Sequence, residues 1–438
     1  MTIESGSAAL KSAERLLAGP LRRLLTWRSD VDGRVVLVAA ITLYLGIIAA
    51  GRLGWGFDLW PYLGVPSGPS LFFDARNLTA SWECQRLGYD PLYDNPCDPW
   101  RRPLMYLRPW LLLGVFGLDQ SHTVALSVVL VAAMFVSFFV LVGRVPLGTG
   151  FLLAVAACSP AVMLAVERAN MDIALFSLVT ISLLLWHTSR RVASVLSVIV
   201  VLLGATAKIY PAFALPAFFM TRSPVASRAA LGCIVVFCAY VGYSFRDIAH
   251  AAEIATQGQL FSYGARILPA HIYHYVGADR WAGPAALKQV LAIIPLASVA
   301  AMCAIWVRRR LTSRREEIMV ATASFVALQA GAFVYLGTFA TVNSFDYRLV
   351  FLLLTLPQLI EWTCTPSHRL SSLAAITLIA AIILLWVGSL SEWLNLWDEL
   401  ASWAVAGLLA TVVAATAPSL QSLRKTVIGD VAFARPSK

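Results

Sequence analysis

The feature that most constrains this chain is a series of about a dozen continuous apolar stretches along its 438 residues, most of them approaching the roughly 20 apolar residues that a transmembrane helix needs. Charged residues make up only 13% of the chain, about half of the usual 25% for a soluble protein. This composition excludes a set of soluble domains, a disordered chain and a disulfide-rich secreted scaffold. Continuous rather than alternating apolar runs also argue against a β-barrel. The sequence therefore predicts an all-α polytopic membrane protein, a bundle of about 12 transmembrane helices with short interfacial helices on its outer face.

The predicted spans are set by the limits of these apolar stretches. They are residues 35–55, 122–142, 147–166, 171–186, 192–207, 209–220, 229–243, 287–307, 319–337, 349–360, 371–387 and 402–417. An even number of spans places both termini on the same side of the membrane.

The distribution of positive charge predicts which side that is. Most of the 34 lysine and arginine residues fall at the two termini and in every second loop. Cytoplasmic loops are enriched in these residues, so both termini are expected in the cytoplasm. The net charge of +10 then reflects loops that face an anionic lipid leaflet rather than a nucleic acid.

This orientation divides the chain into three parts. Residues 1–34 are predicted to be a cytoplasmic amphipathic leader, residues 35–417 the membrane domain, and residues 418–438 a cytoplasmic tail. Two long loops, 56–121 and 244–286, then lie outside. The expected location is the inner (plasma) membrane of a cell, crossed many times, with any chemistry on the outward face.

The first external loop contains a short predicted helix. Between residues 71 and 84, apolar side chains recur at helical spacing, which favours a helix in the outer membrane interface. Asp74 stands at its start, where the helix dipole stabilises an anion. The alternative interpretation is that Asp74 only caps the helix.

The same loop contains Cys84 and Cys97, the only two cysteines in the predicted external loops. An external pair that encloses a turn-rich segment favours a disulfide in an oxidising compartment. The alternative is two unrelated thiols. Metal binding by this pair is the weaker alternative, because no second cysteine or histidine pair occurs at zinc spacing. His271 and His274, one helical turn apart in the second external loop, are only a weak signal for a metal site, so a divalent metal is possible but not indicated.

Polar and aromatic residues gather at the predicted outer ends of the spans. Lys208 stands between two short apolar runs, and a charge at such a position usually has a partner. An anionic phosphate is one candidate partner, while Glu167, Asp172 or extension of the side chain to the membrane interface are the others. The remaining candidates for ligand contact are Arg168 and Arg348 as cations, and Arg76, Asn77, Asn170, Asp172, Tyr210, Tyr347, His271 and His274.

Four short motifs occur in an order that resembles a known enzyme family. They are Asp74 in the first external loop, the hairpin at residues 167–172, the Lys208-Ile-Tyr-Pro segment, and the Tyr347-Arg348 turn. In this order the chain resembles the GT-C superfamily of membrane glycosyltransferases. It is most similar to glycosyltransferase family 87, the polyprenol-phosphate-mannose-dependent mannosyltransferases. The resemblance covers roughly residues 35–362. The family usually has a tyrosine-containing sequence after the aspartate, and the segment between Cys84 and Cys97 is unlike it.

The resemblance implies an enzyme that transfers mannose, or another hexose or pentose, from a polyprenyl-phosphate donor to a lipid- or glycan-linked acceptor. Asp74 would be the general base for the acceptor hydroxyl, with inversion at the anomeric carbon. Lys208, Arg348 and Arg168 would stabilise the leaving phosphate. No cofactor and no nucleic acid partner are expected.

Two other classes fit parts of the pattern. A transporter or flippase of a lipid-linked or small polar substrate would explain the many helices, although it should line the middle of the membrane with polar residues and show inverted repeats. An enzyme similar to O-antigen ligases or polymerases would also work on the outer face with basic residues.

Overall fold

The computed structural model describes residues 19–418, apart from residues 28, 55, 189, 222, 255–260, 266, most of 268–320, 342–343 and 389–394. Most of the predicted span 287–307, both His271 and His274, and residues 419–438 of the predicted tail lie outside the described residues.

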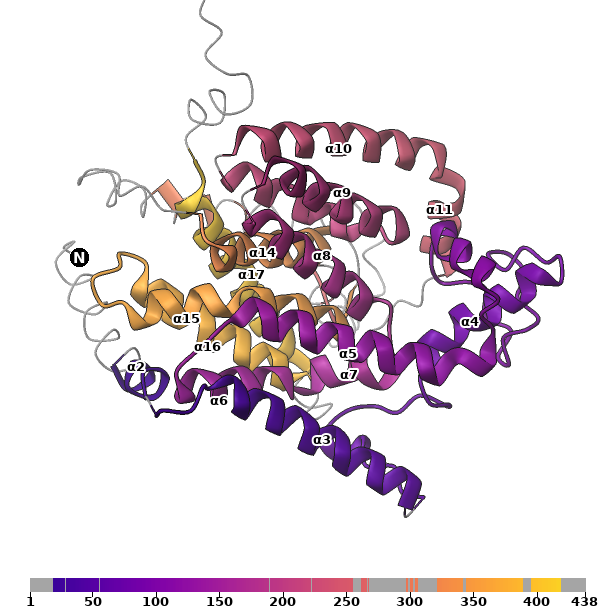
Figure 1. Ribbon diagram of the computed structural model, residues 1–438, viewed down its shortest axis with the longest axis horizontal. Coiled ribbons are helices and arrows are strands. Elements are labelled where there is room, and N and C mark those ends of the chain that lie inside the picture. Colours follow the sequence, from indigo (N-terminus) through magenta and orange to yellow (C-terminus); the bar gives the residue numbers. More distant parts are fainter. Residues whose placement is uncertain are drawn as a thin grey trace, which may run out of the picture.

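Helices account for almost all regular structure in the described residues (Figure 1). In chain order they are α2 (Gly19–Leu25), α3 (Arg34–Gly54), η2 (Pro61–Leu63), α4 (Phe73–Arg86), η3 (Arg108–Phe116), η4 (Gln120–His122), α5 (Thr123–Val142), α6 (Leu147–Ala157), α7 (Pro160–Arg168), α8 (Asp172–His187), α9 (Arg191–Ala207), η5 (Tyr210–Thr221), α10 (Pro224–Tyr243), α11 (Phe245–Ile254), α14 (Ala323–Thr341), η6 (Asp346–Leu354), α15 (Leu356–Cys364), α16 (Ser371–Val387) and α17 (Asn395–Thr416).

A single antiparallel strand pair is found in the described residues. Strand β1 (Ser262–Tyr263) pairs with β2 (Ser344–Phe345), and Ser262 lies opposite Phe345. This pair ties the segment after α11 to the start of η6. The predicted all-α class is confirmed, with this short pair as the exception.

Several of these helices are suited to a membrane. Five are long and apolar enough to cross it, and the bent pair α6–α7 would be a sixth. Shorter apolar helices are α8, α9 and α16. A multi-pass membrane protein is therefore consistent with the fold, while the predicted count of about 12 spans is not confirmed.

Prolines explain where the helices depart from the predicted spans. The predicted span 147–166 is broken, because α6 ends before Ser159 and α7 restarts at Pro160 with a bend of 54°. The predicted span 209–220 is the 3₁₀ helix η5, which contains Pro211 and Pro216. A proline has no N–H to donate to the preceding turn, so it interrupts a regular α-helix.

The helices run back and forth between two ends of the bundle. At one end the first helix docks: Arg22 donates from Nε to the Thr363 carbonyl at 3.0 Å, and Thr149 donates to the Leu25 carbonyl at 2.9 Å. The segment predicted to lie along the membrane surface is thus packed, in the part described, against the bundle. The opposite end, which we call the α4 end, carries α4 and the loop around it (Figure 1).

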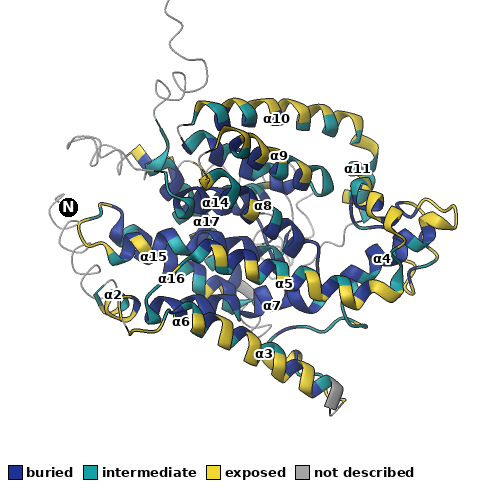
Figure 2. Ribbon diagram, viewed as in Figure 1, coloured by how far each residue is buried: buried dark blue, intermediate teal, exposed yellow. Residues whose placement is uncertain are grey.

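The apolar core lies among the central helices. In the apolar stretch of α14, 67% of residues are buried, against 17% in α10. Figure 2 shows buried residues in the middle of the bundle and exposed ones along the outward sides of α3 and α10. Exposed apolar side chains on such helices, including Leu43 and Val236, suit contact with lipid.

Helix α4 is enclosed by protein on several faces, which the prediction of a short interfacial helix did not anticipate. Its buried residues include polar ones on several faces, among them Asn77, Thr79 and Ser81. The chain that follows α4 folds back over it, and Trp82 donates from Nε1 to the Trp110 carbonyl in η3 at 2.8 Å. A helix forms where the amphipathic spacing predicted one, but the loop that follows α4 covers its polar face as well.

The predicted disulfide is confirmed. Cys84 and Cys97 are bonded, with their Cα atoms 5.5 Å apart across a sequence separation of 13. The bond joins the end of α4 to the loop that folds back over it.

We expect removal of this bond to destabilise the α4 end. Closing a loop of this size contributes about 3 kcal/mol in the chain-entropy model, so Cys84→Ser with Cys97→Ser should lower the unfolding midpoint. The measurement is thermal unfolding in detergent, with Cys238→Ser, an exposed free thiol, as the control. Identical midpoints for the double variant and the wild type would contradict the expectation.

The charge distribution gives a test of orientation. Two cysteine variants are made, one at Asp94 in the loop around α4 and one at Arg310 in the arginine-rich stretch of residues 308–315, called the basic loop. The two should differ in their reaction with an impermeant maleimide added to intact cells. We expect labelling at position 94 and none at position 310, because the basic loop is predicted to be cytoplasmic. Labelling at position 310 without cell lysis would reverse the predicted orientation.

Candidate functional site

Four segments that are far apart in the sequence meet at the α4 end. They are the start of α4, the turn between α7 and α8, the junction of α9 with η5, and the start of η6. Direct side-chain contacts connect them, as set out below, and each segment supplies at least one ionisable residue. These are the four segments singled out in the sequence.

Asp74 lies in the first turn of α4 but does not cap it. The capping position is Phe72, which has a left-handed backbone (φ 54°) and no side-chain capping bond. The Asp74 carboxylate is turned to another helix, because Oδ2 accepts a hydrogen bond of 2.6 Å from Nδ2 of Asn170. Its capping role is thereby excluded, and the residue is only 8% exposed.

The turn between α7 and α8 presents Asn170. Ala169 ends α7 with a left-handed backbone (φ 44°), a conformation that costs a non-glycine residue energy and therefore needs support from its surroundings. While Nδ2 of Asn170 donates to Asp74, its Oδ1 accepts from the backbone N–H of Asp172 at 3.0 Å. One amide thus connects the starts of α4 and α8.

Asp172 brings two cations together. Its carboxylate accepts from Nζ of Lys208, and Oδ2 lies 3.4 Å from Nε of Arg348. The side chain of Asp172 has no exposure, and those of Lys208 and Arg348 are 14% and 15% exposed. The partner that a buried lysine needs is therefore Asp172, and the three groups together carry one net positive charge.

Three tyrosine rings surround the ammonium group of Lys208. Its Nζ lies 5.4 Å from the ring centre of Tyr106, 5.5 Å from that of Tyr210 and 5.7 Å from that of Tyr347. At such distances the faces of aromatic rings attract a cation. Burial, with a contribution from the charge of Asp74, raises the pKa of the loop residue Tyr106 well above its usual value, so its phenol remains protonated.

Asn77, predicted as a substrate contact, has a structural role instead. Its Nδ2 donates to Oδ2 of Asp98 and to the carbonyls of Arg102 and Pro103, at 3.1 to 3.2 Å, and its Oδ1 accepts from the N–H of Met105. Every hydrogen-bonding atom of this side chain is occupied by the loop. Its buried position leaves none for a ligand.

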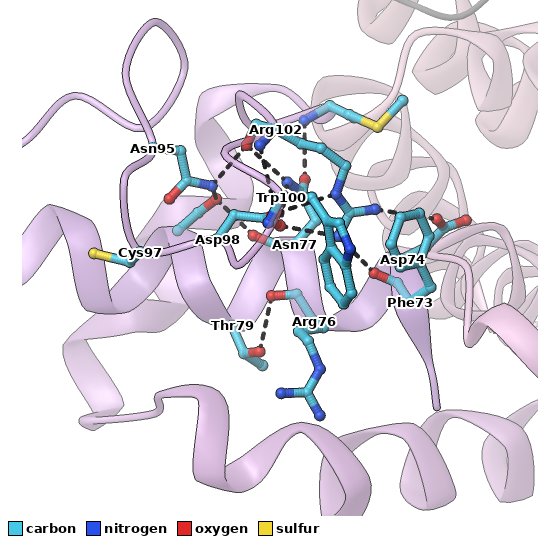
Figure 3. A network of polar contacts seen from close by, with 12 residues as sticks. Phe73, Asp74, Arg76, Asn77, Thr79, Asn95, Cys97, Asp98, Trp100 and Arg102 are labelled. Atoms are coloured by element: carbon cyan, nitrogen blue, oxygen red, sulfur yellow. Dashed lines mark hydrogen bonds and ion pairs between the residues drawn. The ribbon is translucent and has the colours of Figure 1, made fainter. Parts of the chain in front are cut away.

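The two other predicted arginines, Arg76 and Arg168, each have an Nε atom without a hydrogen-bond partner among the described residues. Arg76 points away from the contacts of Asn77 (Figure 3), and Nε has no hydrogen-bond partner among the described residues. Arg168 ends α7 beside Glu167, and its Nε likewise lacks one. Neither joins Lys208 and Arg348 on Asp172.

Glu167 holds the chain before α4. Its Oε1 accepts from the backbone N–H of Gly68 at 2.8 Å, across 99 residues of sequence. Gly68 in turn lies against Phe73, the first residue of α4. Glu167 near the end of α7 and Asn170 in the turn that follows therefore both fix the segment that carries Asp74.

Arg102 was not predicted. Its guanidinium contacts Asp98 at 2.9 Å and lies 4.0 Å from Oδ1 of Asp74. It also covers the ring of Phe73 at 3.5 Å (Figure 3). The only sequence signal was a basic pair within an external loop, which surface arginines would produce equally well.

A group of three acidic residues, Asp346, Asp398 and Glu399, was also not identified as a cluster from the sequence. Asp346 lies with Asp398 around Gly388, where an added Cβ would fall 2.6 Å and 3.1 Å from their carboxylate oxygens. Glu399 follows in α17, and all three residues are buried. Their oxygens Oδ1, Oδ1 and Oε2 have no hydrogen-bond partner among the described residues.

Metal ligands do not gather in the described part of the chain. No group of three or more His, Cys, Asp or Glu residues is arranged there to hold a metal ion. The paired histidines His271 and His274, considered for such a role, lie outside the described residues.

No protein-family model, curated protein or solved structure matches this chain. The function is therefore inferred from the arrangement of its own side chains.

Proposed function

We propose that the chain is a membrane glycosyltransferase that transfers a sugar from a polyprenyl-phosphate donor to a lipid- or glycan-linked acceptor. The observation that carries this proposal is the bridge made by Asn170, which joins the carboxylate of Asp74 to the start of α8, where Asp172 holds Lys208 and Arg348. A base and a phosphate site thereby lie in one cluster.

Each part has a role in a single displacement. Asp74 accepts the proton of the acceptor hydroxyl as its oxygen attacks the anomeric carbon. The bond from that carbon to the phosphate oxygen breaks, and the anomeric configuration inverts. Lys208 and Arg348 stabilise the departing lipid phosphate, which needs a positive environment and no proton. Tyr210, whose ring lies 5.5 Å from Nζ of Lys208 and 5.2 Å from the Arg348 guanidinium, and Arg168 at the end of α7 are further candidate donor contacts.

The charge of the cation cluster favours a monophosphate donor. Asp172 neutralises one of the two cations, which leaves a single positive charge. A sugar phosphodiester of a polyprenol carries one negative charge, whereas a diphosphate carries two. Since an isolated charge is costly to bury, matched charge lowers the cost of binding.

The apolar helices supply the setting for such a donor. Helices long enough to cross a membrane are consistent with a site beside lipid, where a polyprenyl chain resides. With the predicted orientation, the site faces outward from the inner membrane, and both termini are cytoplasmic. Nucleotide sugars are not available there, and the lipid-linked sugar replaces them.

The buried acids favour a second candidate. Asp346, Asp398 and Glu399 lie at the starts of η6 and α17, and ionisable residues inside membrane helices often mark ion pathways. A transporter of a lipid-linked or polar substrate is the function that this group would serve.

A reconstituted assay separates these candidates. The full chain in nanodiscs is incubated with polyprenyl-phosphate mannose, with the corresponding diphosphate, or with a nucleotide sugar, and an octyl glycoside serves as acceptor. We expect glycoside product from the monophosphate alone. Product from the diphosphate would indicate a ligase or polymerase instead. A chain that moves the donor across a vesicle membrane and forms no product would be a transporter.

A further inference from the structure

Arg102 lies between two carboxylates. Its Nε and Nη2 make a forked contact with Asp98, at 3.3 and 2.9 Å, and Nη1 lies 4.0 Å from Oδ1 of Asp74. Nη1 is buried and has no hydrogen-bond partner among the described residues. It is therefore the one guanidinium nitrogen that is aimed at Asp74 without another contact.

The surroundings hold this arginine in place. Its Nη2 also donates to the carbonyl of Phe73 at 2.9 Å, and the guanidinium stacks on the Phe73 ring. Asp98 is fixed in turn by Asn77 of α4 and by the N–H of Trp100 at 2.8 Å. Asp98 immediately follows Cys97, so the disulfide ties this segment to the end of α4.

We propose that Arg102 is a positioning residue for Asp74, and that the segment tied down by the Cys84–Cys97 disulfide carries it to its place. Asp74 then has a cation on one carboxylate oxygen and the Asn170 amide on the other. Together the two contacts hold the carboxylate in one orientation, between the loop that follows α4 and the turn between α7 and α8.

Other titratable groups face Asp74 from the elements packed around it. They are Glu167 of α7, Tyr106 of the loop, Lys208 after α9 and Tyr347 of η6. Lys208 is paired with Asp172, whereas Arg102 lies between Asp98 and Asp74 and has its Nη1, which makes no hydrogen bond among the described residues, 4.0 Å from Asp74. Arg102 therefore has the position from which its loss should be felt most directly at Asp74.

The test measures the protonation of Asp74 without relying on activity. Dicyclohexylcarbodiimide reacts with protonated carboxyl groups, and its adduct on the Asp74 peptide is quantified by mass spectrometry as a function of pH. In Arg102→Gln the labelling curve should move to higher pH, because a positive charge beside the carboxylate is lost. Arg101→Gln, which changes the exposed neighbouring arginine, should leave it unchanged.

Asp98→Asn should shift the labelling curve of Asp74 in the opposite direction from Arg102→Gln. Removal of the competing carboxylate frees Arg102 to act on Asp74, so labelling should require a lower pH. Arg102→Lys keeps the charge and should stay near the wild type. A purely structural role for Arg102 would not move the two labelling curves in opposite directions.

The results separate this inference from the proposed function, on which it rests for the role of Asp74. Coincident curves for Arg102→Gln and the wild type would overturn it, and an upward or absent shift in Asp98→Asn would do so even if Arg102→Gln failed to fold. Shifted labelling in a chain that transfers no sugar would leave the inference standing and remove the proposed function. In an active chain, the acid limb of the pH profile for transfer should move with the labelling curve.

Discussion

Replacing Asp74 with asparagine is expected to slow sugar transfer by about 10²–10⁴-fold, the usual contribution of general-base catalysis. Asparagine keeps the shape of the side chain and can still accept from Asn170, but it cannot take a proton from the acceptor. The fold should remain intact. The measurement is turnover of polyprenyl-phosphate sugar by purified protein, compared with the thermal midpoint of each variant.

The surroundings of the other carboxylates make Asp74 the base to test. Glu167 is bound to the Gly68 N–H, Asp172 to two cations, and Asp346 lies with Asp398 around Gly388. A matched control is Glu83→Gln in the same helix, since Glu83 faces Gln120 away from the site. Near-normal turnover in Asp74→Asn would end its role as base and make Glu167 the next residue to test.

Replacing Lys208 with glutamine is expected to weaken donor binding by about 10–100-fold, because a hydrogen bond to a charged group contributes about 1.5–3 kcal/mol. The change removes the net positive charge of the cluster, since Asp172 then neutralises Arg348. Binding of polyprenyl-phosphate sugar is measured directly by titration of the protein in nanodiscs, so the result does not depend on turnover.

The controls for this variant use the same helix and the same position. Arg191→Gln removes a cation from the opposite end of α9, where it is exposed, and should not alter donor binding. Lys208→Arg keeps the charge and should bind within a few-fold of the wild type. Charge reversal to glutamate is a poor test, because it would bury a second carboxylate against Asp172. Unchanged affinity in Lys208→Gln would remove this residue from the donor site.

The order of motifs in the chain predicted which segments meet, and it did not predict how they pair. Asp172 was considered both as a substrate contact and as a partner for Lys208, and the structure assigns it to Lys208 and Arg348 together. Arg168 was grouped with those two cations and does not join them on Asp172. Spacing places residues at the ends of helices, whereas their pairing depends on how each helix is rotated about its axis.

The loop that covers α4 is a second feature that local sequence patterns could not predict. Periodicity identified the helix within about two residues of its start, because the side-chain pattern along a helix is a local property. It could not reveal that residues 87–122 fold back over the polar face, since a buried polar face looks in sequence like a solvated one. The assignment of Asn77 to substrate failed for this reason: the loop from Asp98 to Met105 occupies all of its hydrogen-bonding atoms.

The sequence by itself determined the helical membrane class, the disulfide and the residue types that gather at one end of the bundle. Those follow from local composition, from helix length and from the presence of just two cysteines in one loop. Tertiary structure alone decided that Asn170 bridges Asp74 and α8, that Arg102 reaches Asp74, and that Asp346 meets Asp398. Each is a contact between distant segments, and its geometry is fixed by the packing of whole helices rather than by any residue near it in the chain.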